Sequence, residues 1–170
     1  MIRKTLATVA ALGLLALGSL NGGLAGPARA DSGSWGTLPG WQVAKTGHDY
    51  QTLIGRLDQA VKANKMGLVT RASATVGAKK ALDQTIPGNM VVGVYHPRFA
   101  VRMLEASVPA GIEAPIRFYI TENGDKSATL SYKTPSSVFA PYSDGGGKLK
   151  AMAAELDEIF AKSSSEAVGP

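Results

Sequence analysis

The residue with the clearest capacity for chemistry is His96, which stands in Tyr95-His96-Pro97 after an apolar run over residues 90–95. Such a run is typical of a buried strand, and a proline at the first position of a helix loses no hydrogen bond. We therefore expect His96 at a strand end and a helix start, where ligands of α/β sheets commonly bind. The helix dipole there disfavours imidazolium, so the neutral ring could ligate a metal or accept a proton. The alternative is that His96 only caps the helix.

Methionines could complete a soft metal site around His96. Thioether sulfur suits copper(I) or haem iron, and the chain offers Met90, Met103 and Met152. Met103 and Met152, however, fall on the apolar stripes of predicted helices, where packing is the ordinary explanation. A haem or copper role thus requires His96 and one methionine to converge. With two histidines and no paired metal-binding motif on one helix, the sequence does not favour a zinc hydrolase.

Arg117 is the second candidate. It stands between Ile116 and Phe118 on a predicted strand, so its side chain should point to the face opposite theirs. If that face lines a cleft, the guanidinium could bind a carboxylate or phosphate through two hydrogen bonds. Otherwise Arg117 is a surface residue or an ion-pair partner of Glu105 or Glu122.

Tyr132 and Tyr142 flank a predicted extended loop, residues 134–143, which contains Pro135 and Pro141. Aromatic side chains beside prolines can wall an apolar pocket while their hydroxyls orient a ligand. Equally, they could cover a sheet edge or form a dimer contact. A candidate pocket would lie between His96 with Pro97, Arg117, and this loop with its two tyrosines.

Signatures of common enzyme classes are missing from the sequence. The run Gly145-Gly146-Gly147-Lys148 lacks the spacing and the following Ser or Thr of a phosphate-binding loop. No serine stands in the frame of a nucleophile elbow. The absence of cysteine excludes disulfides, thiolate catalysis and cysteine-based metal or haem attachment. A binding protein is therefore favoured over an enzyme.

The elements that must position these residues follow from hydrophobic periodicity. Strand-like patterns alternate with helical ones, and Asn123-Gly124 between two alternating runs predicts a hairpin. The order is β-α-β-(α)-β-α-β-β-α, an α+β domain with one sheet of about five strands and helices packed mainly on one face. The expected strands cover residues 41–46, 68–74, 90–95, 116–121 and 127–133, and the expected helices begin near residues 50, 76, 97 and 146.

The amino-terminal thirty residues have the layout of a signal peptide. Arg3 and Lys4 precede an apolar stretch over residues 6–20, and Ala28-Arg29-Ala30 offers a cleavage site. The apolar stretch is shorter than the roughly 20 residues that a spanning helix needs, so we favour cleavage over a retained anchor. The prediction is residues 1–30 removed, 31–40 a flexible leader, 41–162 a single domain and 163–170 a disordered tail. The mature protein would be exported, periplasmic or secreted, with no membrane span.

Charge argues against a nucleic-acid partner. The chain has 18 Lys and Arg against 13 Asp and Glu, a net charge of +5. The predicted signal segment carries three of the basic residues and no acid, so the mature chain has 15 against 13, a net of +2. Nucleic-acid binding needs Lys and Arg clustered on one face, which this balance does not suggest.

Ordered motifs in the chain resemble the family called domain of unknown function 302, a small bacterial α+β domain. The resemblance covers residues 41–161 and implies the fold, frequently a dimer, and no settled activity. Many members have Asn where this chain has His96. The matching stretches are Gly47-His48-Asp49-Tyr50, residues 64–69, Pro97 with Ala100 and Leu104, residues 109–117, and Ser131-Tyr132-Lys133-Thr134-Pro135.

Three hypotheses follow. The first is an exported, non-enzymatic binding module of unknown ligand, a homodimer that takes a small molecule or cofactor in the candidate pocket. The second is a haem- or metal-binding protein that uses His96 as a ligand. The third is a structural subunit of an envelope assembly.

Overall fold

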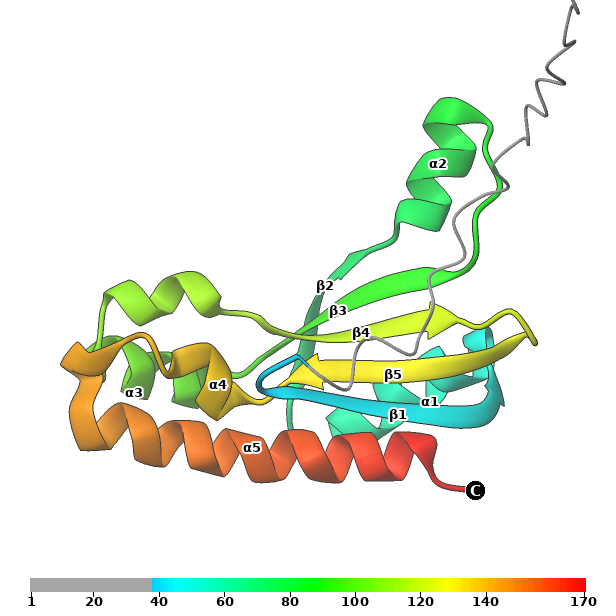
Figure 1. Cartoon of the computed structure of the whole chain (residues 1–170). Helices are drawn as coiled ribbons and strands as arrows, with labels where there is room; N and C mark the ends of the chain where they lie inside the picture. Colours follow the sequence, from blue (N-terminus) through cyan, green and yellow to red (C-terminus); the bar gives the residue numbers. More distant parts are fainter. Residues whose placement is uncertain (1–37) are drawn as a thin grey trace, which may run out of the picture.

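A computed structural model describes residues 38–170 (Figure 1). The predicted signal segment and most of the predicted leader lie outside the described residues. Within residues 38–170, no helix has the length and apolar character needed to cross a membrane.

Five antiparallel strands form a single sheet in the spatial order β1-β5-β4-β3-β2. The predicted hairpin around Asn123-Gly124 is confirmed, because β4 and β5 pair directly. The α+β class and the five-stranded sheet are also confirmed. The strands are β1 (Trp41–Asp49), β2 (Gly67–Ala72), β3 (Asn89–Tyr95), β4 (Ile116–Glu122) and β5 (Ser127–Lys133).

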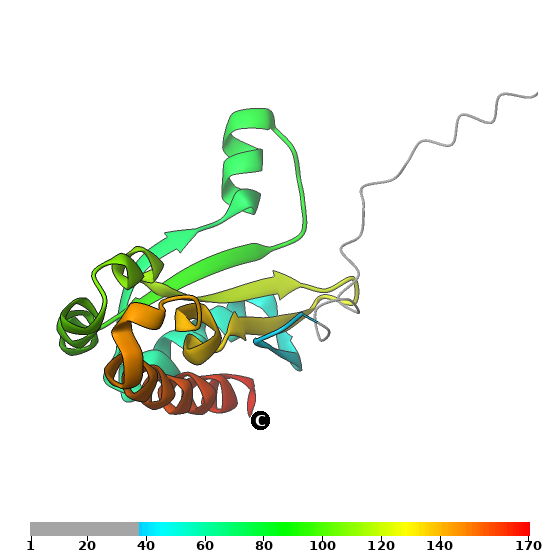
Figure 2. The same ribbon diagram turned by 60° about the vertical axis from the view of Figure 1, so that its left-hand side comes forward.

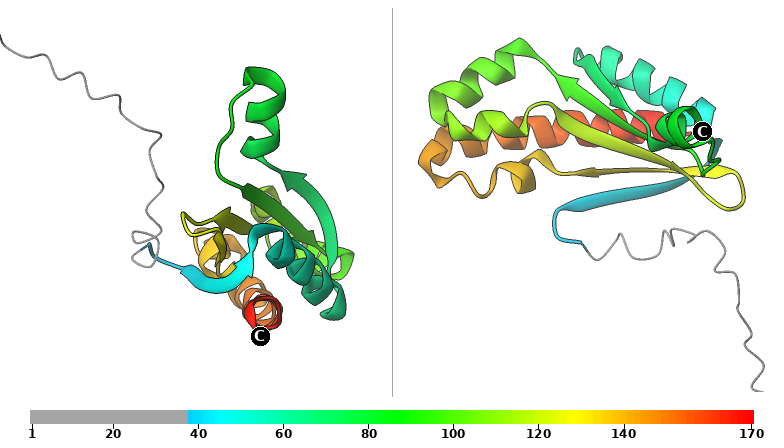
Figure 3. Two further views of the ribbon diagram at one scale, coloured as in Figure 1. Left: turned by 90° about the vertical axis from the view of Figure 1, so that its right-hand side faces the viewer. Right: turned by 90° about the horizontal axis from the view of Figure 1, so that it is seen from above.

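Helices cover one face of this sheet. In Figure 1 the long helix α5 (Gly146–Val168) runs along the side of the sheet away from α2 (Ala74–Leu82), and Figure 3 shows the same arrangement from two further directions. The covering elements contribute the buried side chains of the core. They are α1 (Tyr50–Ala63), α3 (Pro97–Ala106), α4 (Pro135–Phe139) and α5 (Gly146–Val168), with short 3₁₀ turns η2 (Pro109–Glu113) and η3 (Ser143–Gly145).

The helix starts follow local capping rules. Asp49 accepts hydrogen bonds from the amides of Gln51 and Thr52, both at 2.9 Å, at the start of α1. The bonds from Thr52 are the main reason that the pKa of Asp49 lies below its usual value of 3.8. The apolar stripe of α1 then turns toward the sheet, because Leu53, Leu57 and Val61 are buried.

Strand alternation gives the sheet two different faces. In β4, Ile116, Phe118 and Ile120 are buried beneath the helices, whereas Arg117 points to the opposite face, as the sequence pattern predicts. Phe118 stacks on Phe160 of α5 with ring centres 4.6 Å apart. The core therefore lies between the sheet and the helices α1 and α5.

The prediction of a disordered tail over residues 163–170 is wrong, because α5 continues to Val168 with Ser163 and Ala167 buried. Side chains of other elements hold its end. Arg56 of α1 donates to the carbonyl oxygens of Ala167 and Gly169, both at 2.8 Å, and His48 Nε2 lies 2.8 Å from the oxygen of Gly169. Composition predicted fraying, but small serines pack closely where a neighbouring helix can cover them.

Candidate functional site

The face of the sheet away from the helices carries two rows of side chains that run across the strands. The ladder pairs Trp41 with Lys133 and Gly93 with Arg117, and the pairing of Phe118 with Tyr132 places Lys133 next to Arg117. The first row is thus Trp41, Lys133, Arg117 and Gly93. By the same registers, the second row is Val43, Ser131, Tyr119 and Val91.

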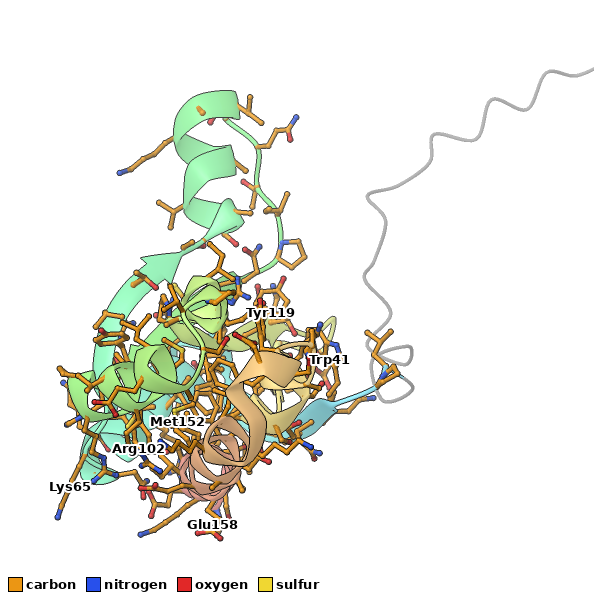
Figure 4. All side chains as sticks on the ribbon, turned by 90° about the vertical axis from the view of Figure 1, so that its left-hand side faces the viewer. Trp41, Lys65, Arg102, Tyr119, Met152 and Glu158 are labelled. Carbon is orange, nitrogen blue, oxygen red and sulfur yellow. The ribbon has the colours of Figure 1, made fainter. Side chains whose placement is uncertain are left out.

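A cleft of about 700 Å³ opens over these rows. Its volume lies within the range of small-molecule sites. Figure 4 shows Trp41 and Tyr119 on the side of the sheet away from Glu158 of α5. The described residues that line the cleft are mainly apolar and come from every strand, from the start of α2, from η2 and from α4: Trp41, Ala72, Ser73, Ala74, Asn89, Val91, Glu113, Ile116, Arg117, Tyr119, Tyr132, Lys133 and Val138.

Two cations stand side by side in this cleft. Arg117 and Lys133 are exposed, and adjacent strands lie about 4.8 Å apart. Lys133 Nζ sits 5.9 Å from the centre of the Trp41 ring, within reach of a cation–π interaction. Within residues 38–170 neither cation forms an ion pair. Like charges opposite each other destabilise a sheet, so an anion placed between them would relieve that repulsion.

Tyr119 adds a neutral hydroxyl to the cleft. Burial raises the pKa of Tyr119 above its usual value of 10.0. The group therefore stays protonated at neutral pH and does not repel an anion. Together with Trp41 it supplies flat apolar surface, which an aromatic ligand can stack against.

Tyr142 acts on the cleft through Glu113. Its hydroxyl donates a hydrogen bond of 2.7 Å to Glu113 Oε1, and this bond raises the pKa of Tyr142. Glu113 lines the cleft, whereas Tyr142 is absent from its described lining. The residues expected as an extended loop here contain α4, which Thr134 caps by accepting from the amide of Ser137. Tyr142 is therefore a positioning residue for the carboxylate of Glu113.

Tyr132 lines the cleft but belongs largely to the core. It is only 6% exposed, and its ring packs against Phe118 and Phe160 with centres 5.1 and 5.7 Å away. Burial raises its pKa above 10.0. The contribution of Tyr132 to the cleft is therefore mainly to its shape.

The structure does not bring His96 and Arg117 together. Gly93 of β3 pairs with Arg117, so both lie on the cleft face of the sheet. His96 comes three residues after Gly93, and because side chains alternate along a strand, His96 lies on the helix side. There His96 caps α3, with Nδ1 accepting from the amide of Arg98 at 3.1 Å, and Pro97 is the exposed first residue of the helix. The prediction of a single pocket between these residues is therefore wrong. The cleft contains Arg117 and Tyr132 but not His96 or Pro97.

His96 instead lines a separate cavity of about 30 Å³ on the helix side. Met103 and Met152 line the same cavity, as does Met66. Met90 does not. Among residues 38–170, no group of three or more His, Cys, Asp or Glu side chains could hold a metal ion. Any metal held in this region would therefore depend on thioether ligands.

Sequence reasoning did not single out most of the residues that line the cleft, among them Trp41, Glu113, Tyr119 and Lys133. The alternation of residues 41–46 indicates that Trp41 lies on one face of a strand, but not which strand lies beside it. Lys133 reaches Trp41 only because β1 pairs with β5, two strands that are far apart in the chain. Glu113 lies in η2, where no periodicity marks it.

Fold and cleft together define a small α+β domain with a ligand-sized hollow on the face of the sheet opposite its covering helices. The chain belongs to the family described as "Domain of unknown function DUF302", whose sequence model matches residues 42–165. The resemblance drawn from the sequence is thereby confirmed.

A solved structure supports the same fold. It is the crystal structure of an uncharacterized conserved protein DUF302 from Bacillus stearothermophilus, with a TM-score of 0.68 and 16% sequence identity. The match covers 76% of this chain and 99% of that chain. No curated protein matches this chain.

Proposed function

We propose that this chain is an exported, non-enzymatic binding domain that takes an amphipathic organic anion in the cleft on the face of the sheet away from α1 and α5. Export rests on the arrangement of the first thirty residues, in which basic, apolar and small residues follow one another as in a signal peptide. The binding proposal is supported above all by the adjacent cations Arg117 and Lys133, which have no ion-pair partner among the described residues. Both cations lie beside aromatic rings in a cleft of about 700 Å³.

The chemistry of the cleft selects a ligand with two parts. Trp41, Val91 and Tyr119 favour a flat apolar body, because burying that surface is favourable. Arg117 and Lys133 favour a carboxylate, sulfonate or phosphate, and Arg can bind such a group through two parallel hydrogen bonds. An aromatic or otherwise apolar acid fits both requirements.

Binding without catalysis is supported by the acid–base groups of the cleft. Glu113, the one carboxyl among the lining residues that the structure describes, accepts the hydrogen bond from Tyr142. Ser73 accepts from the amide of Val76 as the cap of a helix. These hydrogen bonds of Glu113 and Ser73 do not join a nucleophile to a base, the pair that covalent catalysis requires.

Replacing Arg117 with alanine is expected to weaken binding of 2-naphthoate by about tenfold to a hundredfold. A hydrogen bond to a charged group contributes about 1.5–3 kcal/mol, and each 1.4 kcal/mol is a factor of ten in affinity. Isothermal titration of the mature chain measures the dissociation constant directly. The neutral analogue 2-naphthamide should bind to the wild type more weakly than 2-naphthoate does. Its affinity for Arg117→Ala should equal its affinity for the wild type.

The matched control is Arg98→Ala, which removes an arginine from α3 that pairs with Glu155 outside the cleft. This variant should bind 2-naphthoate as tightly as the wild type. An equal loss of affinity in the Arg98 and Arg117 variants would indicate a general charge effect and contradict the cleft. If the wild type binds neither probe, the structural role in an envelope assembly becomes the better hypothesis.

A soft-metal site is the second candidate, because His96 and the three methionines Met66, Met103 and Met152 line one cavity. Imidazole and thioether ligands suit copper(I). The cavity of about 30 Å³ accommodates a single ion but is far below the several hundred Å³ of organic-ligand pockets, so this conformation does not fit haem. A metal at His96 would also compete with the cap, since Nδ1 already accepts the Arg98 amide.

Silver(I), a redox-stable analogue of copper(I), provides the test. If this second function holds, the wild type binds one equivalent and Met152→Leu, a volume-conserving change, binds at least tenfold more weakly. His96→Asn keeps a good helix cap while it removes the imidazole, so it should fold normally and lose the ion as well. Absence of stoichiometric silver binding to the wild type, measured by titration calorimetry, eliminates this function.

A further inference from the structure

The cleft holds a carboxylate as well as two cations. Glu113 of η2 lines it together with Arg117 and Lys133. Within residues 38–170 none of these three groups forms an ion pair. Charges of opposite sign therefore line one cleft without neutralising one another, which leaves both signs available to a ligand.

The three charged groups lie at the same end of the cleft. η2 ends at Glu113 and leads into β4, whose second residue is Arg117. Lys133 is the last residue of β5, which runs antiparallel to β4, so it lies at the same end of the sheet as Arg117. A single head group bound here would face the carboxylate and the cations together.

Tyr142 holds Glu113 at the wall of the cleft. Its hydroxyl donates the hydrogen bond of 2.7 Å to Glu113 Oε1, and the raised pKa of Tyr142 keeps this donor protonated at neutral pH. Among the described residues this is the one hydrogen bond to the carboxylate, so Oε2 can accept from a further donor. Glu113 is also half-buried, and a partly buried charge is screened less by salt than an exposed one.

The opposite end of the cleft is neutral. It is formed by Asn89 at the start of β3 and by residues 72–74, where β2 leads into the helix α2 that projects from the body of the molecule in Figure 2. The side chain of Asn89 is bonded within the chain, because Oδ1 accepts from the amide of Ala74 and Nδ2 donates to Thr75 Oγ1, both at 2.9 Å. The cleft is therefore polarised, with a charged end for a head group and a neutral remainder for the body of the ligand.

We propose that the cleft takes a zwitterion: Arg117 and Lys133 bind its carboxylate, Glu113 binds its ammonium, and an aromatic body lies toward the neutral end. This inference rests on the proposed function, because it narrows the ligand class of the same site. A simple anion between the two cations would share its end of the cleft with the Glu113 carboxylate, and like charges repel. An ammonium on the ligand replaces that repulsion with a charge-assisted hydrogen bond. An aromatic amino acid is a simple ligand with all three parts.

Three ligands that share an indole ring test the proposal by isothermal titration of the mature chain at neutral pH. L-Tryptophan carries both charges, indole-3-propionate lacks only the ammonium, and tryptamine lacks only the carboxylate. The wild type should bind L-tryptophan about tenfold or more tightly than either analogue, because each analogue loses a hydrogen bond between charged groups.

Glu113→Gln is the deciding variant. Glutamine has nearly the same shape, and its amide oxygen can still accept from Tyr142, but it has no charge to offer an ammonium. L-Tryptophan should therefore bind about tenfold or more weakly, whereas indole-3-propionate should bind more tightly because the repulsion is removed. A folding defect would weaken both ligands, so changes of opposite sign report on the charge of Glu113 alone.

Glu158→Gln is the matched control for this variant. It removes the same charge from α5, and Figure 4 shows Glu158 on the side of the sheet away from Trp41 and Tyr119. The affinities for L-tryptophan and indole-3-propionate should both stay unchanged. If Glu158→Gln changes them as Glu113→Gln does, the effect comes from net charge and the proposal is overturned.

Tyr142→Phe tests how Glu113 is positioned. The preference for L-tryptophan over indole-3-propionate should fall, but by less than in Glu113→Gln, because the carboxylate remains and only its hydrogen bond from Tyr142 is lost. A preference equal to that of the wild type would overturn the positioning role of Tyr142.

The outcomes separate this inference from the proposed function. A wild type that binds indole-3-propionate at least as tightly as L-tryptophan overturns the zwitterion and leaves the anion site standing. A Glu113→Gln protein in which both affinities fall together, or in which neither changes, also overturns the zwitterion. Failure of the wild type to bind L-tryptophan, indole-3-propionate and 2-naphthoate refutes the zwitterion and the anion site together.

Discussion

Replacing Phe160 with alanine is expected to lower the free energy of unfolding by about 3–5 kcal/mol, the usual cost of truncating a buried aromatic ring. Phe160 is 1% exposed, and its ring stacks on Phe118 at 4.6 Å and lies 5.7 Å from Tyr132. Its removal leaves a cavity between α5 and the sheet, and it also removes the contact that fixes Tyr132. A loss of this size is a large fraction of the stability of an ordinary domain.

Urea denaturation followed by circular dichroism measures this change. Val101→Ala serves as the control, because Val101 is largely exposed and such substitutions usually change stability by less than about 0.5 kcal/mol. Phe160→Leu should fall between the two, since it retains part of the buried volume. If Phe160→Ala costs no more than Val101→Ala, α5 is not packed on the sheet as described.

Gly93→Ala is expected to destabilise the protein by about 1–3 kcal/mol, although alanine is normally better than glycine in a strand. A Cβ at this buried position would lie 2.1 Å from Thr70 Oγ1 and 2.8 Å from Pro115 Cγ. Thr70 can change rotamer, but Pro115 is a ring in the chain that leads to Arg117. The shift of Pro115 should therefore also weaken 2-naphthoate binding.

Gly47→Ala is the matched control for this prediction. It lies in β1, where an added Cβ meets nothing within 4 Å. Alanine there should be neutral or stabilise the protein by a few tenths of a kcal/mol through the unfolded chain. The same denaturation and binding measurements apply to both variants. Equal stability of the two proteins would show that Gly93 is not covered by Pro115.

Much of the fold could be predicted from the sequence because its signals are local. The stripe of α1, the turn at Asn123-Gly124 and the direction of Arg117 each depend on residues within a few positions of one another. Capping is local as well, which is why His96 was expected at a helix start and is found there. The alternating face of Arg117 required only the two-residue period of a strand.

The candidate site was predicted only in part because a site joins residues that are distant in sequence. His96 and Arg117 were both expected at a sheet, but strand alternation beyond Gly93 sends them to opposite faces. The end of α5 was expected to fray, since its serines carry no apolar signal. Contacts from Arg56 and His48, more than a hundred residues away, hold it in place.

By itself the sequence determined the class of fold, the family and the chemical character of single side chains, because periodicity, capping and turn chemistry act over a few residues. Only the tertiary structure decided that β1 lies beside β5, and therefore that Trp41, Lys133 and Arg117 form one row. It alone separated His96 from that row and left α2 unpacked. Strand order and register are set by the packing of the whole chain, so no local pattern contains them.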